Sequence, residues 1–103
     1  MNKTIKDGRV AVLYSPGYGA GWSTWNPDHP EMVFDPGLVD LVLEGNQEKI
    51  LAYVTLRWSN TVVRSGVDDL EIEWVPEGVE FVIEEYDGAE TIVFKNEVKW
   101  ITA

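Results

Sequence analysis

The period of the hydrophobic side chains changes partway along this chain, and that change limits the folds it can adopt. Across residues 35–58, apolar side chains recur at the three- and four-residue spacing of one helix face. Across residues 70–94, they alternate with polar or acidic side chains, as on a strand with one buried face. A helical segment followed by a run of strands is typical of an α+β fold.

The helical segment carries signals for two helices. Asp35 followed by Pro36 is the usual order of an N-cap acceptor and a proline at the first helical position. Gly45–Asn46 supplies a C-terminal stop for that helix. A second helix is expected from about Gln47 to Trp58, with one apolar stripe made of Ile50, Leu51, Val54 and Trp58.

The remaining apolar runs are predicted to be strands. Residues 9–14 form a short β-rich run that leads into a glycine-rich loop. Turn signals at Pro76–Glu77–Gly78 and Asp87–Gly88 separate the later runs, which end with residues 98–101. We expect residues 1–103 to form a single α+β domain, in which two helices pack on a largely antiparallel C-terminal meander of three or four strands.

The loop from Ser15 to Asn26 carries the strongest signal for a ligand. Its alternating glycines allow close approach of the backbone, and consecutive free N–H groups can form a concave site for phosphate. Neighbouring aromatic rings could stack on a base. The predicted ligand-binding residues are Gly17, Tyr18, Gly19, Gly21, Trp22, Trp25, Asn26 and Arg64. The alternative is a glycine-rich loop whose tryptophans complete a small core, with Arg64 pairing with a nearby acid.

No catalytic residue, cofactor or metal site is predicted. The chain has no cysteine, and its one histidine, His29, lies between prolines in a loop. Neither a G-x-S-x-G elbow nor a dinucleotide or P-loop motif is present. Asp68–Asp69 could bind a hard cation, although the end of a solvated loop is the simpler interpretation. These features favour a binding protein over an enzyme.

The negative charge of the chain is concentrated in one segment. The formal net charge is −10, and the ten carboxylates from Asp68 to Glu90 are uninterrupted by Lys or Arg. Such a field repels a phosphate backbone and argues against direct nucleic-acid binding. The segment is either a solvated surface or one that imitates nucleic acid and docks on a basic protein. The residues of that predicted partner surface are Asp69, Glu71, Glu73, Glu80 and Glu84.

The location expected from the sequence is the cytoplasm. Residues 1–9 are polar and basic without an apolar signal region, and no apolar run approaches the roughly 18 residues that a membrane helix needs. The absence of cysteine also favours a reducing compartment. No membrane partner is expected.

Three sequence segments resemble small uncharacterised proteins of tailed bacteriophages. They are SPGYGAGWSTWN, DLEIEWVPEG and EYDGAE, at residues 15–26, 69–78 and 85–90. The resemblance implies an origin but transfers no site residue. It implies two anti-defence roles: a sponge that sequesters a nucleotide-derived immune signal, or an inhibitor that covers a basic surface of a host protein. A homo-oligomer could supply the enclosure that a small-ligand site needs.

Overall fold

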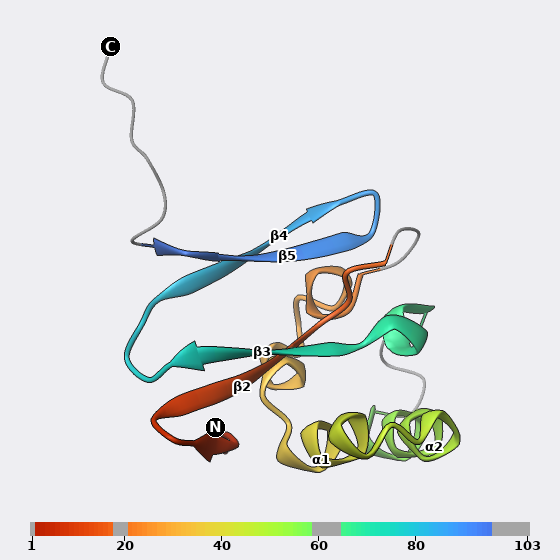
Figure 1. Cartoon of the computed structure of the whole chain (residues 1–103). Helices are drawn as coiled ribbons and strands as arrows, with labels where there is room; N and C mark the ends of the chain where they lie inside the picture. The colour runs from red at the N-terminus through yellow and green to blue at the C-terminus, as the bar shows by residue number, and fades with distance from the viewer. Residues whose placement is uncertain (1, 18–20, 59–64, 96–103) are drawn as a thin grey trace.

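The protein has an α+β fold with two helices and two antiparallel sheets, as the sequence predicts (Figure 1). The computed structural model describes residues 2–17, 21–58 and 65–95. One sheet has the order β1-β2-β3, and the other is a hairpin of β4 and β5. These strands are β1 (Ile5–Lys6), β2 (Arg9–Tyr14), β3 (Glu71–Pro76), β4 (Phe81–Tyr86) and β5 (Ala89–Phe94).

The predicted single meander is wrong, because the C-terminal strands are divided between the two sheets. β3 pairs with β2 over its whole length, from Arg9↔Pro76 to Tyr14↔Glu71, and not with β4. Pro76 lacks an N–H group, and the connection after it carries the chain into a second layer. There β4 packs against one face of the first sheet, for example through Phe81, and does not extend the edge of that sheet. The strand expected at residues 98–101 lies outside the described residues.

The two helices match their predicted boundaries. α1 (Pro36–Glu44) begins where the Asp35 side chain accepts a hydrogen bond from the Leu38 N–H at 3.0 Å, and it ends at Gly45, whose φ is 77°. α2 (Gln47–Trp58) buries three of its four stripe residues. Leu51 is the exception: it is exposed, because one step around the helix from Ile50 leads away from the sheet.

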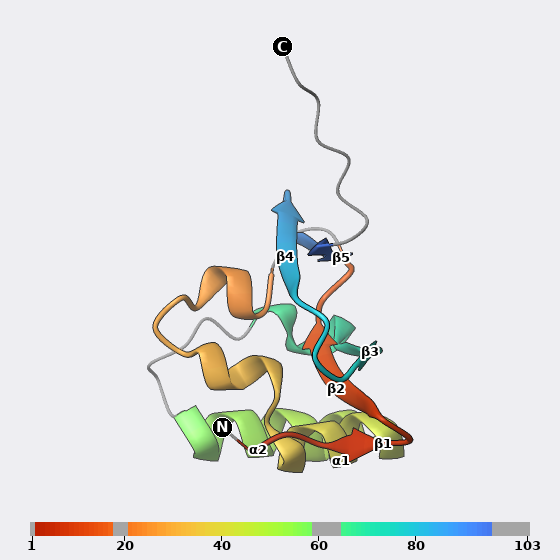
Figure 2. The same cartoon turned by 90° about the vertical axis from the view of Figure 1, so that its left-hand side faces the viewer.

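Two apolar clusters lie on the two faces of β2. On one face, Ala11 and Leu13 pack with residues of α1, α2 and the 3₁₀ segment η2 (Pro30–Val33), and with Trp22, which directly precedes the 3₁₀ segment η1 (Ser23–Trp25). On the other face, Val12 packs against the β4–β5 hairpin. The molecule therefore has three layers, with helices, the β1-β2-β3 sheet and the hairpin in that order (Figures 1 and 2).

Candidate functional site

Trp22 and Asn26, two of the predicted ligand contacts, belong to the interior. Trp22 is fully buried, and its Nε1 donates a hydrogen bond to the Met32 carbonyl at 2.9 Å. Its ring packs edge-on against Trp58, with 5.8 Å between the centroids. Asn26 is buried and donates from Nδ2 to the Trp22 carbonyl at 2.8 Å. The predicted stacking role of Trp22 is therefore corrected: in a small domain this indole is needed to fill the core.

The carboxylate of Glu90 is held by the backbone of the loop that follows β2. One oxygen, Oε1, accepts a hydrogen bond from the Ser15 N–H at 2.8 Å. The other, Oε2, accepts from the Trp22 N–H at 2.8 Å and from the N–H and hydroxyl of Thr24 at 3.0 and 2.6 Å. The loop thus binds an anion through residues other than the predicted Gly17 and Gly21, and that anion belongs to the protein itself.

The other predicted ligand residues are spread over different surroundings. The Trp25 side chain is 36% exposed, whereas Gly21 is buried against it. Gly17 lines an open cleft. Tyr18, Gly19 and Arg64 lie outside the described residues. Within the described part of the loop, Trp25 is therefore the predicted aromatic contact that retains an accessible ring.

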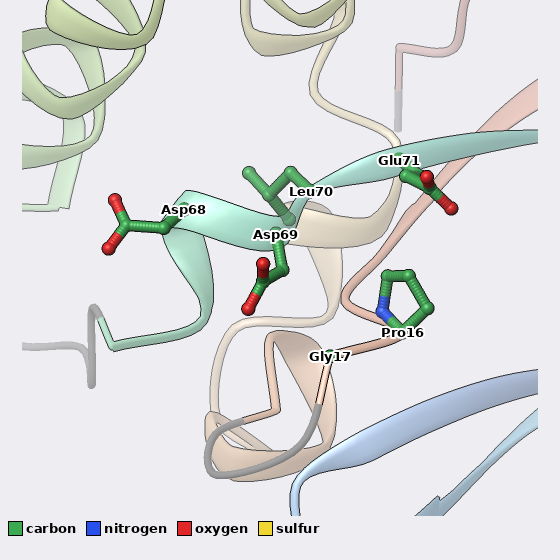
Figure 3. A pocket seen from close by; sticks show the side chains of 6 residues that line it. All are labelled: Pro16, Gly17, Asp68, Asp69, Leu70 and Glu71. Atoms are coloured by element: carbon green, nitrogen blue, oxygen red, sulfur yellow. The ribbon is translucent and has the colours of Figure 1, made fainter.

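The cleft beside Gly17 is acidic. It has a volume of about 360 Å³ and is lined by Pro16, Gly17, Asp68, Asp69, Leu70 and Glu71. Figure 3 shows the Asp69 side chain directed toward the Gly17 backbone, while Asp68 and Glu71 point in other directions. Within the described ranges, no group of three His, Cys, Asp or Glu side chains is placed to hold a metal ion. The cleft therefore disfavours an anionic ligand, and its three carboxylates do not converge on one point.

A second acidic cleft adjoins it between β3 and the hairpin. Its volume is about 280 Å³, and its lining includes Tyr14, Glu73, Glu90 and Thr91. Burial raises the pKa of Tyr14, and the negative charges of Glu71 and Glu73 raise it further, together with a hydrogen bond to Glu71. The Tyr14 hydroxyl therefore lies in a locally negative field.

The predicted partner surface is divided by the fold. Asp69 ends the 3₁₀ segment at residues 65–69, and Glu71 and Glu73 follow it on one face of β3. Glu84 lies on the hairpin strand β4, and Glu80 forms an ion pair with Lys95, with 2.7 Å between Oε2 and Nζ. The structure thus brings together three of the five predicted residues.

Most carboxylates of the acidic segment form no ion pair with the residues that the structure describes. Of the ten between residues 68 and 90, Glu90 is buried and Glu80 is paired with Lys95. The other eight form no ion pair within the described part of the chain; they are Asp68, Asp69, Glu71, Glu73, Glu77, Glu84, Glu85 and Asp87. All eight are exposed except Glu73, which is half-buried.

The outer edge of β3 presents backbone groups next to these carboxylates. The Glu77 N–H bonds to the Gly8 carbonyl at 2.9 Å, so in the β2–β3 ladder the backbone groups of residues 71, 73 and 75 face β2. Those of Ile72 and Trp74 consequently face away from it. Within the described residues β3 has no partner on that side. Figure 2 shows β3 and β5 as the outer strands on the same side of the molecule.

A set of hydrogen-bonded polar side chains connects η2 with the two helices. Asp35 accepts a hydrogen bond from the Tyr53 hydroxyl at 2.6 Å and pairs with Arg57, with 3.4 Å between Oδ2 and Nε. Burial and the hydrogen bond to Asp35 raise the pKa of Tyr53 to about 12. Glu31 accepts a hydrogen bond from the Trp58 indole at 3.1 Å and contacts His29 Nδ1 at the same distance. These side chains satisfy one another, which indicates a structural role.

Glu90 is the important site residue that the sequence interpretation missed. It was counted among the surface carboxylates, yet its side chain is only 2% exposed. The available signal was strand parity: Glu90 stands two and four residues before Ile92 and Phe94, which pack on the second apolar cluster. A carboxylate on the inward face of a strand requires internal hydrogen-bond donors.

The membrane and family comparisons add little to this geometry. Within residues 2–17, 21–58 and 65–95, no helix has the length and apolar character to cross a membrane. The phage resemblance of the sequence stays a prediction. No match to the chain was found among protein-family models, curated proteins or solved structures.

Proposed function

We propose that this protein is a non-enzymatic binding protein that docks on a basic partner protein through the acidic edge, defined here as Asp69, Glu71 and Glu73 with the outer backbone of β3. The observation that carries the proposal is that these three carboxylates form no ion pair with any residue that the structure describes. Neutralising them is left to solvent ions or to a partner. A sponge for a nucleotide-like ligand has less support, because the loop amides already bind Glu90 and the adjoining cleft is acidic.

The outer backbone of β3 supports a specific mode of docking. Extended peptides often bind by adding a strand to an open sheet edge, where main-chain hydrogen bonds give affinity and side chains give specificity. At this edge the outward groups of Ile72 and Trp74 alternate with Glu71 and Glu73. An incoming strand with lysine or arginine at alternate positions would satisfy both the backbone and the carboxylates.

The same carboxylates set the specificity that we expect. They repel nucleic acid and acidic proteins, and they accelerate the encounter with a basic surface. If the phage resemblance reflects the origin of the chain, the partner would be a basic host or defence protein. The contact would then block that protein without any chemical step.

A short peptide of alternating lysine and valine is a defined probe for this surface. We expect it to bind the protein with an affinity that falls steeply with added salt, because exposed charges are screened within roughly 8 Å at physiological ionic strength. The same peptide with N-methyl groups on alternate amides keeps its charge but cannot add a strand. It should bind at least about tenfold more weakly, a difference of about 1.4 kcal/mol.

Charge-reversal variants locate the binding surface. Glu71→Lys with Glu73→Lys should abolish peptide binding, whereas the matched pair Asp40→Lys with Glu48→Lys, on exposed helix positions, should weaken it only slightly. Equal losses from the two pairs would show that the peptide responds to net charge alone. Unchanged affinity after reversal at Glu71 and Glu73 would refute the proposal. Pull-down of a basic protein from cells should depend on the same two residues.

A further inference from the structure

Glu90 is a buried carboxylate that accepts four hydrogen bonds from residues that the structure describes. Its side chain is 2% exposed, and within the described residues no Lys, Arg or His forms an ion pair with it. The four donors come from Ser15, Trp22 and Thr24, at 2.6 to 3.0 Å. Both carboxylate oxygens accept hydrogen bonds: Oε1 from one donor and Oε2 from three. This is the donor arrangement of a binding site for a carboxylate ion.

The contact joins two parts of the fold that belong to different sheets. The β4–β5 hairpin is a separate sheet and pairs with no strand of the β1-β2-β3 sheet. Besides its side-chain bonds, Glu90 donates its own N–H to the Ser15 carbonyl at 2.8 Å. Residues about 70 positions apart in the chain are therefore tied together at one end of the hairpin.

We infer that Ser15, Trp22 and Thr24 form a carboxylate-binding site, that Glu90 is its internal ligand, and that a small carboxylate from solution can replace that ligand when the side chain is removed. The inference does not depend on the proposed docking surface. Glu90→Ala removes Cγ, Cδ and both oxygens, which are the heavy atoms of acetate. Acetate should therefore fit the vacated space and meet the same four donors.

Thermal unfolding of Glu90→Ala in added salts tests the inference. We expect its melting temperature to lie roughly 10–20 °C below that of the unsubstituted protein. Sodium acetate should raise it by about 5 °C more than sodium chloride at equal concentration, because a ligand that binds only the folded state stabilises it. Acetamide, which has the same shape but no charge, should have no such effect.

Glu84→Ala is the matched control on the neighbouring strand. Glu84 is exposed on β4, and its removal should leave the response to acetate equal to the response to chloride. If acetate, chloride and acetamide act alike on Glu90→Ala, the loop does not select a carboxylate and the inference fails. If that variant is unfolded without acetate, recovery of its helical circular dichroism on adding acetate supports the site.

A second pair of variants tests the donors in a protein that keeps Glu90. Thr24→Val removes the hydroxyl donor at 2.6 Å and should lower the melting temperature by about 4–8 °C. Thr91→Val removes an exposed hydroxyl from the same hairpin and should change it by less than about 2 °C. Equal effects would overturn the inference. So would rapid hydrogen exchange of the Trp22 and Thr24 amides in the unsubstituted protein.

Discussion

Single residues decide the polar contacts between the two helices, and Tyr53 is the clearest case. Its hydroxyl reaches the Asp35 carboxylate at 2.6 Å only because residue 37 is a glycine. A Cβ at position 37 would lie 2.4 Å from that hydroxyl oxygen, closer than two such atoms can approach. Gly37, Asp35 and Tyr53 therefore act as one unit, in which the glycine leaves room for the hydrogen bond between the other two.

We predict that Tyr53→Phe destabilises the protein at neutral pH but not at high pH. The folded-state pKa of Tyr53 is raised from 10.0 to about 12, by burial first and then by Asp35. Folding thus favours the neutral hydroxyl. The contribution of Tyr53 to the free energy of unfolding is therefore fully present below pH 10 and is lost as the pH rises toward 12. The variant should lose about 1 kcal/mol at neutral pH. Urea unfolding across this range measures the difference.

The control for this prediction is Tyr86→Phe, because Tyr86 is exposed on the hairpin. Its stability should follow that of the unsubstituted protein at every pH. A gap between Tyr53→Phe and the unsubstituted protein that stays constant up to pH 12 would contradict the assigned pKa.

Two glycines of the loop are predicted to differ in their tolerance of a methyl group. A Cβ at Gly21 would lie 2.5 Å from the Thr24 hydroxyl oxygen, which is already bonded to Glu90. Gly21→Ala should therefore cost about 1–3 kcal/mol through overpacking. A Cβ at Gly17 would meet the carboxylate of Asp69, an exposed side chain that can rotate away. Gly17→Ala should cost less than about 0.5 kcal/mol. Denaturant midpoints of the two variants rank them, and a reversed order would refute the argument.

The sequence shows that this loop can bind an anion and place aromatic rings, but it does not show whether these groups face a ligand or the protein interior. The glycines indicate an anion site for a ligand, whereas the amides of Ser15, Trp22 and Thr24 bind a carboxylate of the protein itself. That carboxylate is 66 to 75 residues away in sequence, at Glu90, and local patterns cannot specify such a partner. Trp22 was assigned to a ligand because aromatic residues serve cores and binding sites alike. Only the packing against Trp58 distinguishes the two.

At the scale of elements, the beginning of α1 depends on one side chain with several partners. Asp35 caps the helix through Leu38, accepts from Tyr53 and pairs with Arg57. We predict that Asp35→Ala lowers the free energy of unfolding by about 2–3 kcal/mol, because it removes the helix cap and leaves the Tyr53 hydroxyl without its acceptor. Asp35→Asn keeps an oxygen for Leu38 and should cost about 1 kcal/mol less. Helical circular dichroism during unfolding measures both, and equal losses would show that the cap contributes little.

The helices were predictable because their signals are local, whereas the pairing of strands was not. Asp35–Pro36 and Gly45 mark the ends of α1 within a few residues of its body. The Asp87–Gly88 turn likewise specifies the hairpin, with φ values of 52° and 86° that suit a type I′ turn. The partner of β3 is set instead by which apolar faces meet after collapse. Alternation in residues 70–74 is equally compatible with β2 or β4 as a neighbour.

At the scale of the whole molecule, the layers separate apolar and acidic surfaces. β2 is buried on both faces, so residues 11–13 are all inaccessible, and the charge is displaced to the strands around it. β3 carries Ile72 and Trp74 toward the helices, whereas its glutamates face the hairpin side, where Val75 packs. This placement leaves carboxylates close together that pair with no cation in the described ranges, an arrangement whose mutual repulsion lowers stability.

Neutralising part of this surface should stabilise the protein while it abolishes docking. We predict that Glu71→Gln with Glu73→Gln raises the free energy of unfolding by on the order of 0.5 kcal/mol at low salt, and that added salt removes the gain. The pKa of Tyr14 should fall, because these two carboxylates help to raise it. Tyrosinate absorbance during alkaline titration measures the pKa, and urea unfolding at two salt concentrations measures the stability. Asp40→Asn with Glu48→Gln changes the net charge equally but should leave the Tyr14 pKa unchanged. If both pairs stabilise the protein equally and neither moves the Tyr14 pKa, the negative charge is spread over the molecule and β3 is not a distinct acidic edge.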